Sequence, residues 1–160
     1  MKRPGDPKSG DVIRVEIRDE SIVCGHFLKA WKLNGPLVEF YECPLSWVVN
    51  HGFSDCKKLF GPIIVLLKQP VREGKWEIIG SIPVEVFNLP KFLMMGRGYE
   101  PIWWVCEGSR EEPLGVVVPD EYKSLERYYV YTYEQVEQRL LDGTTPYSLE
   151  GFKKAYGIEP

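Results

Sequence analysis

Side chains that bind metals or act as nucleophiles are few in this chain, which holds two histidines and four cysteines. Cys24 and His26 are two residues apart in an alternating segment, so both point to the same face of a strand. His51, Cys43 and Cys56 could add ligands from an irregular segment. Structural zinc sites, however, use ligand pairs at short spacing, and no Cys-x-x-Cys pair is present. We therefore predict no metal; if one binds, Cys24, His26 and His51 are its expected ligands.

Other catalytic chemistry has no local signature. The chain lacks a Gly-x-Ser-x-Gly nucleophile elbow. The stretch Gly96-Arg97-Gly98 is not followed by the Gly-Lys-Ser/Thr of a phosphate loop. No catalytic residue and no cofactor is therefore predicted. Two alternatives stay open: a metal-assisted phosphoester hydrolase that uses His26 and His51, and a small-ligand module with a cleft under residues 94–98.

Carboxylates are more abundant than metal ligands. Glu111 and Glu112 form an acidic pair in a charged turn predicted at residues 109–112. Glu134 and Glu137 are three residues apart on the exposed side of a predicted helix, where they repel slightly. A surface that tolerates such repulsion is suited to a basic protein partner.

Aromatic residues are the second indication of a binding surface. Trp103 and Trp104 are adjacent in a predicted strand, so their rings face opposite sides and only one can fill a given core. Tyr129 belongs to a cluster with Tyr128 and Tyr131. Trp and Tyr are enriched where proteins bind each other. We select Trp104 and Tyr129 as candidate anchors.

The length, charge and apolar runs of the chain exclude several classes of protein. A chain of 160 residues fits one domain, and a net charge of −3 disfavours nucleic-acid binding, which needs a basic face. The longest apolar runs, residues 63–67 and 115–118, are far shorter than a membrane span. No apolar stretch follows the basic residues at the N-terminus, so no secretion signal is predicted. We expect a cytoplasmic protein that binds neither nucleic acid nor membrane.

Most of the chain has the pattern of strands. Alternating or continuously apolar segments between turn residues predict seven of them, at residues 11–17, 22–29, 37–41, 63–67, 75–82, 101–107 and 114–118. Residues 70–74 are predicted as a turn and 86–98 as a long mobile connection, whereas 42–61 has no clear pattern.

Helix is expected only late in the chain. Thr132 with Gln135 three residues on is a capping-box pattern, and Gly143 suits the left-handed position that ends a helix. A second short helix is predicted over residues 148–156. The fold class is therefore α+β and β-dominated, with a mostly antiparallel curled sheet or small barrel and one or two C-terminal helices. We expect a flexible lead over residues 1–9 and a single domain over 10–160.

The order of these motifs resembles the Immunity protein 26 family, whose members protect bacteria from polymorphic toxins. The resemblance covers roughly residues 10–142. Its motifs are Gly10-Asp11-Val12 before a hairpin, Val38-Glu39-Phe40-Tyr41, the run of residues 63–67, Trp76-Glu77-Ile78-Ile79-Gly80 with Pro83, Pro90-Lys91-Phe92, and a helix over residues 133–141.

The resemblance implies a β-dominated fold and a non-catalytic function, the neutralisation of a cognate toxin by direct binding. Some relatives carry a phosphotriesterase label, which keeps the hydrolase as the alternative. The expected partner is a toxin protein, and the chain itself is expected to be a monomer or weak homodimer. The candidate partner-binding residues are Trp104, Tyr129, Glu111, Glu112, Glu134 and Glu137.

Overall fold

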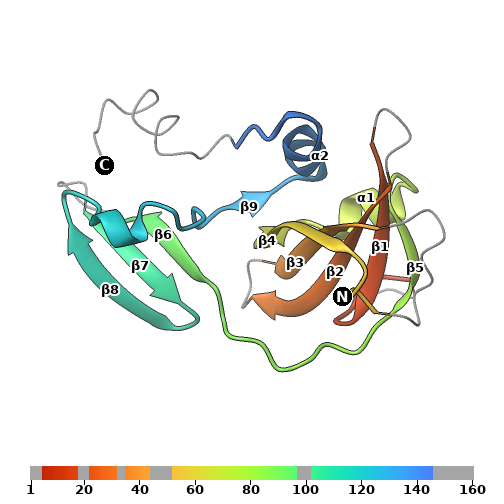
Figure 1. Ribbon diagram of the computed structural model, residues 1–160, viewed down its shortest axis with the longest axis horizontal. Helices are drawn as coiled ribbons and strands as arrows, with labels where there is room; N and C mark the ends of the chain where they lie inside the picture. Colours follow the sequence, from red (N-terminus) through yellow and green to blue (C-terminus); the bar gives the residue numbers. More distant parts are fainter. Residues whose placement is uncertain (1–4, 18–21, 32–34, 44–51, 97–101, 146–160) are drawn as a thin grey trace. The chain divides into compact units, whose positions relative to one another are not determined.

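The computed structural model describes residues 5–17, 22–31, 35–43, 52–96 and 102–145 (Figure 1). By their contacts these residues divide into two compact units. The first unit draws on Met1–Val86 and Val130–Thr144, and the second on Phe87–Tyr129 and Thr145–Pro160. The single domain expected over residues 10–160 stays a prediction, and each unit is described by itself.

A curled six-stranded sheet forms the first unit. Its strand order is β5-β1-β2-β3-β4-β9, antiparallel except for the last pair, and β5 and β9 are its edges. The strands span Asp11–Glu16 (β1), Ile22–Trp31 (β2), Gly35–Glu42 (β3), Lys57–Val65 (β4), Glu77–Ser81 (β5) and Val130–Tyr131 (β9). The predicted β-dominated fold with curled antiparallel sheet is thus confirmed, in its open form rather than as a closed barrel.

One face of this sheet, the inner face, carries the core of the first unit. Ile13 and Val15 on β1 alternate with residues that point to the opposite, outer face. On β2, Gly25 leaves room for the ring of Phe40 on β3, whose atoms would lie 3.2 Å from an added Cβ. The Phe40 ring in turn meets Trp76 edge-on, with ring centroids 6.3 Å apart. A large aromatic pair therefore fills the space that the glycine opens.

Helix α2 (Tyr133–Asp142) has the capping predicted for it. The backbone N–H of Gln135 donates to the Thr132 hydroxyl, while the Gln135 side chain accepts from the Thr132 N–H. Gly143 ends the helix with a left-handed φ of 74°. Tyr133 meets Trp76 edge-on at 6.2 Å, so α2 packs over the inner-face core.

Helix α1 (Lys68–Arg72) occupies the first part of the segment, residues 70–74, for which a turn was predicted, so the prediction was wrong there; residues 73–74 form the turn. Pro70 suggested a break in the chain. It lies instead in the first turn of the helix, where a backbone N–H has no helical partner and its absence costs nothing. The Pro70 carbonyl then accepts hydrogen bonds from the N–H groups of Lys75 and Trp76, which directs Trp76 inward.

The second unit is a three-stranded antiparallel sheet of order β6-β7-β8, followed by a 3-10 helix over Asp120–Tyr122. Its strands span Lys91–Met95 (β6), Trp103–Glu107 (β7) and Arg110–Gly115 (β8). Strand β6 lies inside the region predicted as a mobile connection. Strand β8 begins within the residues predicted as a turn and ends at Gly115, earlier than the predicted strand over 114–118. The actual turn is the two residues Gly108 and Ser109.

The described part of the expected N-terminal lead contacts the first unit. Asp6 forms an ion pair with Arg72 of α1 at 2.9 Å, and the Ser9 hydroxyl donates to the Leu28 carbonyl of β2 at 2.6 Å. The mobility expected of residues 1–9 stays a prediction. The helix predicted over residues 148–156 lies outside the described residues.

Candidate functional site

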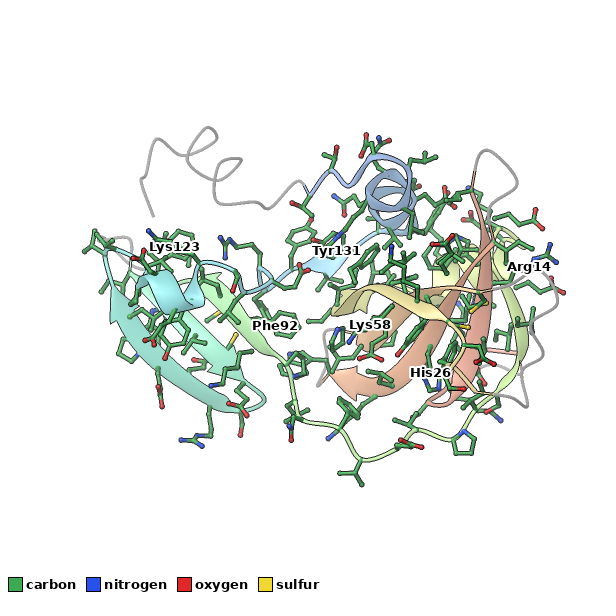
Figure 2. The ribbon with its side chains drawn as sticks, in the orientation of Figure 1. Arg14, His26, Lys58, Phe92, Lys123 and Tyr131 are labelled. Carbon is green, nitrogen blue, oxygen red and sulfur yellow. The ribbon has the colours of Figure 1, made fainter. Side chains whose placement is uncertain are left out.

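Five titratable side chains from three neighbouring strands lie together on the outer face of the first unit's sheet. Cys24 and His26 share that face, as their spacing predicted, and the strand register places Tyr41 and Glu39 beside them on β3. Lys58 follows beside Tyr41 on β4. We call these five residues the outer-face cluster; Figure 2 labels two of them, His26 and Lys58. They meet because polar residues alternate with core residues along three neighbouring strands.

Glu39 is the centre of a hydrogen-bonded group within the cluster. The Tyr41 hydroxyl donates to one carboxylate oxygen at 2.6 Å, and the Lys58 ammonium donates to the other at 2.9 Å. The Glu39 side chain is only 17% exposed, so the ion pair with Lys58 offsets part of its desolvation. Burial, and then the carboxylate that the phenol faces, raise the pKa of Tyr41 above its usual value.

This raised pKa predicts a pH-dependent effect of Tyr41→Phe. Near pH 7 the variant should lose about 1–2 kcal/mol of unfolding free energy, since it lacks a hydrogen bond to a charged acceptor. The neutral phenol contributes stability fully below its ordinary pKa of 10.0, and this contribution is lost as pH rises towards the higher folded pKa. The difference between wild type and variant should therefore shrink above about pH 10. Urea unfolding from pH 7 to 11 measures it.

The matched control is Tyr122→Phe in the second unit. Tyr122 is likewise half-buried, so its replacement reports what the loss of a phenol costs away from Glu39. A Tyr41→Phe deficit that grows with pH contradicts the assigned hydrogen bond.

Three thiols lie at one end of the same face. The Cys56 thiol donates to the Cys43 sulfur with the Sγ atoms 2.7 Å apart, and buried Cys24 packs with Cys43. Burial is the main cause that raises the pKa of both Cys24 and Cys43. Phe53 covers this end of the sheet, because its ring stacks on Tyr41 with centroids 4.3 Å apart. Cys24 and Cys43 are therefore held protonated near this aromatic lid, the ring of Phe53.

His26 is held by the backbone. Its Nε2 lies 2.9 Å from the Ile82 carbonyl oxygen, and since a carbonyl only accepts, Nε2 carries the proton. Its ring also packs against Phe53 at 4.9 Å. Within the described ranges, no three His, Cys, Asp or Glu side chains are arranged to hold a metal. His51 lies outside those ranges, so the expectations about a metal stay predictions.

The six candidate partner-binding residues divide between the two units. Trp104 and Glu111 lie on one face of the β7–β8 pair, since the register pairs Trp104 with Pro113 and Cys106 with Glu111. Trp104 is half-buried with its indole against Gly96, whereas its neighbour Trp103 is fully buried, as the adjacent pair predicted. Tyr129 is half-buried at the end of the second unit.

Glu112 points to the other face of β8, where it borders a small hollow of about 130 Å³. Basic, acidic and uncharged side chains line this hollow. They are Lys91, Val105, Glu107, Arg110, Glu112 and Tyr122. Sequence reasoning missed this hollow because β6 was not predicted. The cleft expected under residues 94–98 falls partly outside the described residues.

Glu134 and Glu137 belong to α2 in the first unit and differ from each other. Glu134 is exposed in the first helical turn, where a backbone hydrogen bond lowers its pKa. Glu137 is half-buried, and its carboxylate accepts a hydrogen bond from the Trp76 indole at 2.9 Å. Glu137 therefore has a structural role that a surface interpretation of the helix did not reveal.

Comparison with family models, curated protein sequences and solved structures found no match to this chain. Across the described residues, no helix has both the length and the apolar composition needed to cross a membrane.

Proposed function

We propose that this chain is an immunity protein that neutralises a cognate bacterial toxin by direct binding, without catalysis. The observation that carries the proposal is the edge strand β8, which presents two exposed carboxylates: Glu111 on the face that it shares with half-buried Trp104, and Glu112 on the opposite face. The order of sequence motifs that resembles the Immunity protein 26 family supports the same function.

Strand β8 has the features of a recognition edge. It has a strand neighbour on one side only within the described sheet, so a partner strand or loop can approach its other side. Arg110 offsets little of the acidic charge, because its 3.9 Å contact to Glu112 joins two largely exposed side chains. Carboxylates at such a rim attract a basic partner and raise the association rate, while an aromatic anchor slows dissociation.

The test uses growth protection and binding kinetics. Candidate toxins, encoded by genes that neighbour this one, are expressed in a host with and without the chain, and growth is measured. For a toxin that the chain neutralises, the double variant Glu111→Lys/Glu112→Lys should associate about tenfold more slowly at low salt, with little change in dissociation. Surface plasmon resonance at two salt concentrations measures both rates.

The matched control is Glu77→Lys/Glu85→Lys, which reverses two exposed charges in the first unit. It should bind and protect as the wild type does. Equal slowing by both double variants would assign the effect to net charge and contradict a site on β8.

The same assay addresses the alternative, a metal-assisted phosphoester hydrolase. Its expected ligands are His26 and His51, so a His26→Gln variant that folds but no longer protects would favour the enzyme. An immunity protein that acts by binding through β8 protects equally well with this variant.

A further inference from the structure

Strand register brings two distant cysteines together on the first unit. The last pair of the β3–β4 ladder is Glu42 opposite Lys57. Cys43 follows Glu42 and Cys56 precedes Lys57, so the two cysteines occupy the next opposing positions. Their sulfur atoms are 2.7 Å apart, closer than a non-bonded sulfur contact normally is. Cβ atoms at opposing positions are about 4.5–5.5 Å apart, and a disulfide needs about 3.5–4.5 Å, so a small approach of the two strand ends is enough to form the bond.

The accessibility of the thiols differs in a way that suits oxidation. Cys24 is 1% exposed and Cys43 8%, whereas Cys56 is only partly buried. A small oxidant therefore reaches the Cys56 sulfur first and has Cys43 directly behind it. Cys24 packs next to Cys43 on the far side and stays a buried thiol. Burial also raises the pKa of the Cys43 thiol, which makes it a poor first target for an oxidant.

We propose that Cys43 and Cys56 are a reversible redox pair, in which hydrogen peroxide converts the two thiols into a disulfide. The Cys56 sulfur attacks one peroxide oxygen, the O–O bond breaks, and the products are a Cys56 sulfenic acid and water. The Cys43 sulfur then attacks the Cys56 sulfur. The S–O bond breaks, the S–S bond forms, and the hydroxide takes the Cys43 proton and leaves as a second water. Two electrons pass from the thiols to one hydrogen peroxide.

The bond would tie the described residues just before Cys56 to the end of β3. At the described end of that segment, Phe53 stacks on Tyr41 and packs against His26. The Cys56 N–H already donates to the Phe53 carbonyl at 3.0 Å. Oxidation therefore ties the aromatic lid to β3 through a bond that a dithiol reductant reverses. This site is independent of the binding function proposed for β8, which lies on the second unit.

The experiment treats the reduced full-length protein with hydrogen peroxide and counts free thiols under denaturing conditions. The count should fall from four to two, with a mass loss of about 2 Da, and dithiothreitol should restore it. Peptide mapping of the non-reduced protein should join Cys43 to Cys56.

Cys106→Ser is the matched control, since Cys106 is buried in the second unit with its thiol directed at the Phe92 carbonyl. This variant should still lose two thiols, whereas Cys56→Ser should form no internal disulfide. The proposal is overturned if four thiols persist in the wild type, or if mapping places the bond at Cys24 or Cys106. Mapping needs only the wild type, so a Cys56→Ser variant that fails to fold does not affect the decision.

Discussion

Replacing Trp76 by alanine should lower the free energy of unfolding of the first unit by about 3–5 kcal/mol, the usual cost of truncating a buried aromatic residue. Trp76 is 1% exposed, and its ring meets both Phe40 of β3 and Tyr133 of α2 edge-on. Truncation to alanine therefore removes contacts to the sheet and to the helix at once. Urea unfolding followed by far-UV circular dichroism measures the loss.

The hydrogen bond from the Trp76 indole to Glu137 allows this cost to be divided. Trp76→Phe keeps most of the ring volume and loses the N–H donor. Glu137→Ala keeps the ring and leaves a buried donor unpaired, which should cost about 1–3 kcal/mol. In a double-mutant cycle the two changes should be non-additive. A loss below about 1 kcal/mol for Trp76→Ala would contradict its place in the core.

Gly61→Ala should destabilise the first unit by about 2–4 kcal/mol, because two costs combine. Gly61 has a φ of +109°, which a residue with a Cβ adopts only under strain. An added Cβ would also lie 2.8 Å from the Val38 carbonyl oxygen and 3.0 Å from the Glu39 Cα. Both are backbone atoms of β3 that cannot move without disturbing the β3–β4 ladder. Chemical denaturation measures the change in unfolding free energy.

Gly74→Ala is the control, because it shares the positive φ but not the crowding. Its φ is +70°, and no atom lies within 4 Å of an added Cβ. It should cost about 1 kcal/mol, the strain of the left-handed conformation alone. Equal losses for the two variants would show that the close approach of β3 at Gly61 is not important. A Gly61→Ala variant that folds should also show a weakened ion pair between Lys58 and Glu39, because Glu39 is one of the displaced residues.

The elements that could be predicted from the sequence carry an explicit local signal. Strand β1 alternates apolar with charged residue types, so its period of two is visible, and α2 carries explicit capping residues. Strand β6 has no such signal. Its apolar residues Phe92 and Leu93 are adjacent, each 1% exposed, and Pro90 and the nearby glycines suggested a connection instead. Strand β8 was read as a turn because its first residues are charged, as edge strands often are.

Only the parts of the site that lie within one strand could be predicted from the sequence. Cys24 and His26 share a face because a strand alternates, and that much follows from their spacing. The contact between Cys43 and Cys56 depends on the register between two strands, and the sequence between them has no interpretable pattern. The group around Glu39 depends on the same register. Glu39 and Tyr41 already had the alternation that could have indicated a polar outer face, but their partner Lys58 comes from a strand predicted to begin later.

The first unit is assembled from two stretches of chain that the second unit interrupts, and this affects how the protein is made. A ribosome that has completed β1 to β5 has not yet synthesised β9 or α2, which follow the second unit in the sequence. Until those residues emerge, β4 has no parallel neighbour, and the Trp76 indole lacks both Tyr133 and the carboxylate of Glu137. The nascent sheet therefore leaves apolar surface exposed while the second unit is being translated. During that interval the growing chain is prone to aggregate through this surface.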